Sequence, residues 1–300
     1  MVRRAIWALL LVVSLVAPIA AHAQGDYLDV YIAKVKPEKL ADFEAITKKW
    51  IDANKRFNGD TWIAMETVYG EGNVYQFTST RQDYGEIDKI NEAVMAAANK
   101  AFGKEAGEKM ERDFLNCLVW SRSELRRRRW DLSRKAPADA AAYAKLIGDS
   151  RVLRTTAVHV RPGRIADFEA YLKEAKEAGE KNANTAPVFV SQVIEGSKGT
   201  MFYVSTLRSS LGGFDKNPTM RDILGEEGYK KFLQMNAEAV EETQSTLFRF
   251  SPGLSNPPEE IAKVAADFWH PKPMMAAASK SKAAAGNAAE MKPTAEKPRQ

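Results

Sequence analysis

Apolar residues change their spacing along residues 27–60, and this change predicts a strand followed by a helix. Segment 27–35 is rich in β-branched and aromatic residues, which is typical of a strand. Pro37 then opens a helix, at a position where its missing N–H costs nothing. A turn at 57–60 ends that helix. Its apolar stripe has helical spacing and consists of Leu40, Phe43, Thr47, Trp50 and Ile51.

Two more strands, a long helical region and a last strand complete this half. The two strands are predicted at 61–69 and 74–80, on either side of a Gly-Glu-Gly-Asn hairpin signal. The helical region is interrupted at Gly103, and the last strand is predicted at 121–128. The order β-α-β-β-α-β is the ferredoxin-like arrangement of the α+β class. The apolar face of the helical region consists of Ile87, Ile90, Val94, Ala98, Phe102, Met110, Phe114 and Leu118.

The second half of the chain repeats this pattern, so the sequence predicts an internal duplication. Segment 35–45 aligns with segment 160–170, and seven of these eleven positions are identical. Gly225 takes the place of Gly103. Three alignments of strands accompany these matches: 27–35 with 153–160, 77–80 with 203–206, and 123–127 with 245–249.

Each repeat ends in a proline-led helix, predicted at 137–146 and at 258–268. The first of these helices also connects the two repeats. The chain therefore divides into a signal peptide (1–23), a first repeat with its connector helix (24–150), a second repeat with its helix (151–270) and a tail (271–300).

In element order and in its duplicated Pro-x-x-x-x-Asp-Phe-Glu segments, the region 27–270 resembles the dimeric α+β barrel superfamily in its tandem, pseudo-dimeric form. In that superfamily the bare face of one sheet is covered by a second copy. The resemblance implies a monomer whose two sheets pack face to face and enclose a cavity. The superfamily includes cofactor-free monooxygenases, haem-dependent peroxidases, chlorite-cleaving enzymes and haem-degrading enzymes, so the fold alone does not select a function.

The two ends of the chain differ from the rest in composition. Arg3 and Arg4, an apolar run at 5–20 and a small-x-small site at 21–23 predict a cleaved signal peptide, because the run is short for a membrane anchor. We therefore expect a periplasmic or secreted protein that is not membrane-bound after cleavage. The tail at 271–300 is rich in Ala, Lys and Pro and is expected to be disordered.

The positive charge of the chain is concentrated in its ends. The formal net charge is +5, but the tail carries six basic and two acidic residues, and residues 24–270 alone sum to −1. A nucleic-acid-binding protein would show a basic folded domain, so we expect no nucleic-acid partner. The single cysteine, Cys117, excludes an intramolecular disulfide, and its apolar neighbours predict a buried thiol.

Few residues suggest chemistry. His159 lies on the first strand of the second half, and strand alternation directs it toward the barrel cavity if Val158 and Val160 pack against the helices. There it could be an axial haem ligand or an acid/base group, or a simple hydrogen-bonded histidine. Clustered Cys and His residues are absent from the sequence, which predicts no metal site.

Two arginines mark a second candidate site. Arg126 and Arg128 align with Phe248 and Phe250 of the other half. Facing the cavity, they would bind a carboxylate or phosphate; at a fraying strand end, they would be solvated charges that discourage edge pairing. The second interpretation is favoured, because two buried like charges are costly.

Aromatic residues on the strands could line an apolar pocket for a flat ligand or form ordinary core, and Tyr31 and Tyr203 are the candidates for the pocket. The leading hypothesis is therefore an exported small-ligand-binding or accessory module with a cavity between the sheets. The alternatives are a cofactor-free monooxygenase-like enzyme, and a haem-binding protein that uses His159. No catalytic residue is identified.

Overall fold

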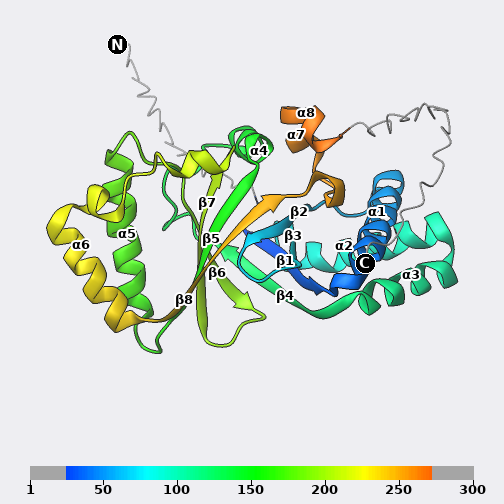
Figure 1. Ribbon diagram of the computed structural model, residues 1–300, viewed down its shortest axis with the longest axis horizontal. Helices are drawn as coiled ribbons and strands as arrows, with labels where there is room; N and C mark the ends of the chain where they lie inside the picture. Colours follow the sequence, from blue (N-terminus) through cyan, green and yellow to red (C-terminus); the bar gives the residue numbers. More distant parts are fainter. Residues whose placement is uncertain (1–24, 272–300) are drawn as a thin grey trace, which may run out of the picture.

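The computed structural model describes residues 25–271, so the predicted signal peptide and residues 272–300 of the predicted tail lie outside the described residues. The fold is mixed α+β, with a barrel of antiparallel strands at its centre and helices outside it (Figure 1). No helix within 25–271 is both long and apolar enough to cross a membrane.

The first half follows the predicted order of elements. Two local signals set its boundaries: Asn58 ends α1 in the left-handed region at φ 52°, and Gly103, at φ 82°, separates α2 from α3. The Asp83 side chain caps α2 by accepting a hydrogen bond from the Glu86 N–H. The elements are β1 (Tyr27–Val35), α1 (Leu40–Phe57), β2 (Ile63–Tyr69), β3 (Val74–Arg81), α2 (Tyr84–Phe102), α3 (Lys104–Asn116) and β4 (Leu118–Arg128).

The second half has the same order of strands and helices. Gly225 interrupts α6 with a non-helical φ of 71°, at the place where Gly103 divides the first half. Thr219 and Asp222 form a capping box at the start of α6. The elements are α4 (Ala140–Asp149), β5 (Val152–Val160), α5 (Ile165–Lys181), β6 (Phe189–Glu195), β7 (Thr200–Arg208), α6 (Met220–Ala239), β8 (Val240–Phe250), α7 (Glu259–Ala262) and α8 (Ala266–Trp269), with a short 3-10 helix η2 (Leu211–Phe214) before α6.

The eight strands form one closed barrel in the order β1-β3-β2-β8-β5-β7-β6-β4. The sequence predicted only that the sheets of the two halves pack face to face. They also join edge to edge, through β2 with β8 and β4 with β6. Closure leaves no free strand edge in the barrel. Helices α1–α3 cover the outside of one half, α5 and α6 cover the other, and α4, α7 and α8 lie over one end of the barrel (Figure 1).

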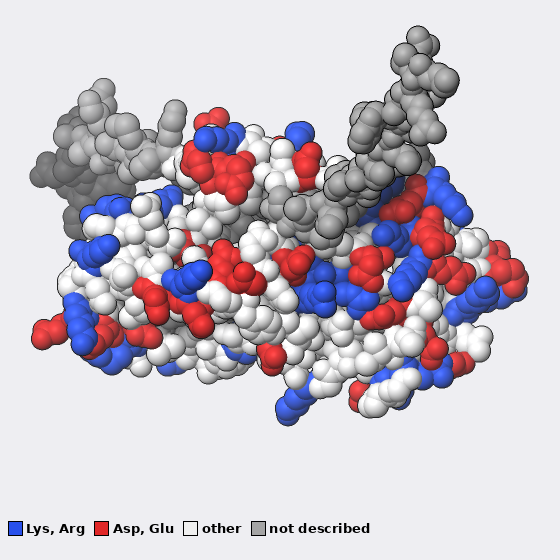
Figure 2. Space-filling model, turned by 180° about the vertical axis from the view of Figure 1, so that it is seen from behind, with Lys and Arg blue, Asp and Glu red and all other residues white. Residues whose placement is uncertain are grey.

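Apolar packing forms separate clusters on the two sides of the sheet. One cluster, which includes Phe43, lies between β1–β4 and their helices, and its counterpart in the other half includes Phe168. A third cluster joins the barrel end to α4, α7 and α8 around Trp269. Inside the barrel, Val30, Ile32 and Val74 pack together. On the face seen in Figure 2, basic and acidic side chains are interspersed.

Several predicted boundaries were wrong. Leu118 begins β4 and does not belong to the preceding helix, so β4 starts three residues before its predicted start at 121. The connector helix begins at Ala140, where the Asp139 side chain caps it, and the predicted helix 258–268 is divided into shorter pieces. The alignment of 77–80 with 203–206 is one residue out of register. Strand pairing matches Phe77 with Val204, so Phe77 faces the helices while Tyr203 faces the barrel interior.

Candidate ligand-binding site

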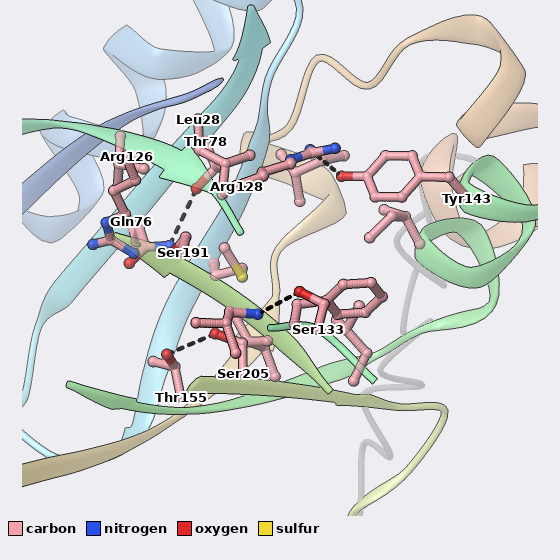
Figure 3. Close-up of a pocket in the computed structure, with 18 of the residues that line it drawn as sticks. Leu28, Gln76, Thr78, Arg126, Arg128, Ser133, Tyr143, Thr155, Ser191 and Ser205 are labelled. Carbon is pink, nitrogen blue, oxygen red and sulfur yellow. Dashed lines mark hydrogen bonds between the residues drawn. The ribbon is translucent and has the colours of Figure 1, made fainter. Parts of the chain in front are cut away.

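Three of the predicted site residues lie together inside the barrel. Arg126, Arg128 and Tyr203 project from β4 and β7 into the interior, and Arg126 and Arg128 are only 4% and 8% exposed (Figure 3 shows the two arginines). The favoured interpretation of these arginines as solvated charges at a strand end was therefore wrong. The alignment that equated them with Phe248 and Phe250 was right, because all four positions face inward.

Glu124 neutralises one of these two buried charges, that of Arg126, and was not among the residues predicted from the sequence. Its carboxylate is 2% exposed and lies 2.7 Å from an Arg126 nitrogen and 3.1 Å from Nε of Arg122. The Tyr203 hydroxyl donates to Glu124 at 3.2 Å, and the Arg126 guanidinium stacks over the Tyr203 ring at 3.5 Å from its centroid. Period-two alternation along β4 was the signal, since it places Glu124 on the same face as Arg126.

Arg128 is held at the end of the barrel that α4 covers. One of its nitrogens donates to the Tyr143 hydroxyl of α4 at 2.6 Å and to the Thr80 hydroxyl at 3.1 Å. Two cavities lie inside the barrel, and Arg126 lines both of them. Their volumes are about 120 and 90 Å³. Pockets for drug-sized ligands commonly measure about 300–1,000 Å³. The barrel interior is therefore too well filled to hold such a ligand.

His159 and Tyr31 lie apart from that group. Alternation along β5 puts His159 on the interior face, and Val158 and Val160 pack on the helices as expected. However, His159 sits near the last residue of β5, paired with Met201 and Glu242, and does not line either interior cavity. This position does not fit an axial haem ligand. Tyr31 faces the helices, where its ring packs on Phe114.

The larger cavities lie outside the barrel, between each sheet and its helices. The first-half cavity, of about 340 Å³, lies between strands β1 and β3 and helices α1–α3. The second-half cavity, of about 630 Å³, lies between β5–β7 and helices α5 and α6. The expectation that the main cavity would lie between the two sheets was therefore wrong, because the inward side chains of β4 and β7 fill that space.

The first-half cavity contains a neutralised arginine. Arg81 donates to both carboxylate oxygens of Asp60, at 3.0 and 2.6 Å, and to Asp29 at 3.2 Å. Burial alone would lower the pKa of Arg81, but hydrogen bonds and charge attraction from Asp60 and Asp29 outweigh it and leave the pKa raised. Ser79 also donates to Asp60, at 3.1 Å. Arg81 therefore forms a buried ion pair, and its charge is not available to a ligand.

The second-half cavity contains three arginines without such partners. Arg134, Arg154 and Arg208 line it, and no carboxylate lies within 4.0 Å of their side-chain nitrogens among residues 25–271. Burial lowers the pKa of Arg208, and the neighbouring charges of Arg154 and Arg134 lower it further. Uncharged acceptors hold two of these side chains: Arg208 donates to the Gly213 carbonyl at 3.1 Å, to the Leu207 carbonyl at 2.7 Å and to the Asn217 side chain, and Arg134 Nε donates to the Ala186 carbonyl at 3.2 Å.

Apolar and aromatic side chains form most of the remaining wall. Tyr171 is 8% exposed, its ring stacks on Phe232 at a centroid distance of 5.3 Å, and its hydroxyl has no hydrogen-bond partner within 25–271. Burial, with a smaller contribution from Glu174, raises the pKa of Tyr171. Tyr171 and the three arginines were not among the site residues predicted from the sequence. Aligning the first strands residue by residue would have shown one signal, the exchange of Asp29 for Arg154.

The described residues contain no group of three or more potential metal ligands. Cys117 is buried, its thiol donates to the Asp113 carbonyl at 3.2 Å, and burial raises its pKa. A thiol with a raised pKa is a poor nucleophile, so its placement agrees with the predicted structural role.

Comparisons with known proteins found similar structures but no similar sequences. No family model and no curated protein matches the chain. Solved structures similar to this chain include an anthrone oxidase-like protein, with 14% identity, coverage of 77% of this chain and 93% of that one, and a TM-score of 0.48. A chlorite dismutase mutant from Candidatus Nitrospira defluvii has 8% identity, coverage of 79% and 94%, and a TM-score of 0.45. A haem-binding protein from Thermus thermophilus has 13% identity, coverage of 77% and 93%, and a TM-score of 0.41. With its closed barrel and external helices, the chain has the dimeric α+β barrel architecture within a single polypeptide.

Proposed function

We propose that this protein is an exported, monomeric small-ligand-binding protein, built from two tandem ferredoxin-like repeats, and that its ligand occupies the second-half cavity. Its volume of about 630 Å³ falls within the usual range of roughly 300–1,000 Å³ for small-molecule sites. Export is supported by the three regions of the signal sequence at 1–23. The near-neutral charge of residues 24–270 supports a small molecule over a nucleic acid as the partner.

The observation that carries the proposal is the unpartnered Tyr171 hydroxyl on the wall of this cavity. A buried hydroxyl without a hydrogen bond is unfavourable, by about 1–3 kcal/mol. The Tyr171 ring stacks on Phe232, which restricts the movement of the hydroxyl toward another acceptor. A ligand that accepts a hydrogen bond from Tyr171 removes this cost.

The neutral fluorophore N-phenyl-1-naphthylamine tests the location of the site. The wild-type protein should give a saturable rise in fluorescence. Ala175→Trp, which fills the cavity from α5, should abolish that rise. Ala106→Trp is the matched control, since Ala106 is an exposed helical alanine of the other half. Equal binding by wild type and Ala175→Trp would move the site elsewhere, and no saturable signal from any variant would refute the proposal.

The position of His159 does not support the haem alternative. Haem needs a cavity next to its axial ligand, whereas this side chain lies beyond interior cavities of about 120 and 90 Å³. The oxygenase alternative lacks a residue in a defined catalytic geometry, since the sequence identified none and the similar structures show fold alone. Binding is therefore the function that the geometry supports best.

A further inference from the structure

The register of the strands makes the two large cavities comparable position by position. In the first half, Tyr27 on β1 pairs with Arg81 on β3, and in the second half Val152 on β5 pairs with Arg208 on β7. Arg81 and Arg208 are therefore equivalent residues at the ends of equivalent strands. Each lines the cavity of its own half.

Both carboxylates that neutralise Arg81 are missing around Arg208. Asp29 lies two positions after the start of β1, and the residue two positions after the start of β5 is Arg154. Asp60 lies three positions before β2, and the residue three positions before β6 is Ala186. A carboxylate is thus replaced by a cation in one case and by a methyl group in the other.

Hydrogen bonds confirm the second of these equivalences. The Asn256 side chain donates to the Asp60 carbonyl at 2.6 Å, and the Arg134 side chain donates to the Ala186 carbonyl at 3.2 Å. The backbone bridges agree, since Trp62 pairs with Asn256 and Val188 pairs with Arg134. The neutral Asn256 of one half is therefore exchanged for the cation Arg134 in the other.

A glycine on α5 makes room for this added arginine. A Cβ placed on Gly179 would lie 2.3 Å from both Cδ and Nη1 of Arg134. The equivalent position on α1 is Asn54, whose side chain accepts from the Asp60 N–H at 2.8 Å. The space that the Asn54 side chain occupies in the first half is therefore occupied by the Arg134 guanidinium in the second half.

These exchanges reverse the charge of the site. The four first-half positions carry one arginine and two aspartates, whereas the equivalent second-half positions carry three arginines and an alanine. None of the described residues that line the second-half cavity is Asp or Glu. Three guanidiniums at one end of a cavity repel one another, and an anion between them removes that repulsion.

From this reversal we propose that the second-half cavity binds an organic anion, a carboxylate or sulfonate attached to an apolar, aromatic body. The anionic group binds at Arg134, Arg154 and Arg208, whose forked donors suit such oxygens. The Phe214 ring, 4.9 Å from the Arg154 guanidinium and 5.5 Å from that of Arg208, orients both cations. The body of the ligand lies against the aromatic wall that includes Phe232. This inference rests on the proposed binding function and adds the class of ligand.

A pair of dyes tests the inference. 8-Anilinonaphthalene-1-sulfonate carries the same rings as N-phenyl-1-naphthylamine plus one sulfonate, so the ratio of their dissociation constants reports recognition of the charge. The wild-type protein should bind the sulfonate at least about ten-fold more tightly. Ala186→Asp returns the first-half carboxylate to the site, and Arg154→Gln removes an exposed cation without cutting into the core. Both variants should bring the ratio of the two dissociation constants close to one, because they weaken binding of the sulfonate more than binding of the neutral dye.

The control is Arg112→Gln, which removes an exposed arginine of α3 in the other half and should leave the ratio unchanged. Displacement by 2-naphthoate but not by 2-naphthamide would extend the result from sulfonate to carboxylate. If both dyes bind the wild type equally, the anion inference is overturned and the binding function stands. If neither dye binds, the binding function itself fails. If Arg112→Gln lowers the ratio of dissociation constants as much as Arg154→Gln does, the sulfonate dye responds to surface charge, and the inference is also overturned.

Discussion

Replacing Asp60 with alanine should destabilise the protein strongly. The Asp60 carboxylate accepts two hydrogen bonds from Arg81, at 3.0 and 2.6 Å, and one from Ser79, at 3.1 Å. Arg81 is 4% exposed, so Asp60→Ala leaves a buried guanidinium with only the more distant Asp29. Removing one partner of a buried ion pair costs about 3–5 kcal/mol. Because Asp29 remains, we expect the lower end, about 3 kcal/mol.

Urea denaturation followed by tryptophan fluorescence measures this loss. About 3 kcal/mol corresponds to a melting temperature lower by roughly 6–12 °C for a domain of this size. The control is Asp149→Asn, which breaks an exposed pair with Lys145 one helical turn away and should cost less than about 0.5 kcal/mol. If Asp60→Ala lowers the free energy of unfolding no more than Asp149→Asn does, Asp60 and Arg81 do not behave as a buried ion pair, and Asp60 does not neutralise Arg81.

Three further predictions concern residues of the barrel and the cavities. Glu124→Gln should lower the free energy of unfolding by about 3 kcal/mol in urea denaturation, because it leaves the buried Arg126 without its carboxylate; a loss below about 1 kcal/mol would contradict this. Folding raises the pKa of Tyr171 above its ordinary value of 10.0, so the free energy of unfolding should fall as the pH rises above 10; wild type should therefore lose stability more steeply from pH 10 to about 11 than Tyr171→Phe, and parallel curves would refute this. Haemin titration of wild type and His159→Ala should give the same absorption spectra, and a Soret shift that requires His159 would restore the haem alternative.

Local signals in the sequence predicted most of the fold. Pro37, the hairpin glycines and the interruptions at Gly103 and Gly225 act over a few residues, and the structure places them as expected. Register was harder to predict. A shift of one residue turns a side chain to the other face of a sheet, and the alignment of Phe77 with Tyr203 contained such a shift.

The candidate site was less accessible from the sequence, because its contacts are not local. Asp60 lies in the loop before β2, and its partner Arg81 is twenty-one residues away along the chain. Arg134 follows the first repeat in sequence but lines the cavity of the second. The size of the inter-sheet space depended on how completely Arg126 and Tyr203 fill it, and residue types alone do not determine packing of that kind.

Fusion of the two halves is what permits their cavities to differ. In a homodimer, every exchange that frees an arginine would occur twice, and both copies would lose the stabilising pair that Asp60 forms with Arg81. In a single chain, the first half keeps that pair while Arg208, in the equivalent place, is left with cationic neighbours. The cost of arginines that lack a carboxylate partner is therefore confined to one half, and the other half supplies stability to the barrel that they share. We therefore expect variants of Asp60 to change the stability of the protein and variants of Arg154 to change its binding of the sulfonate dye.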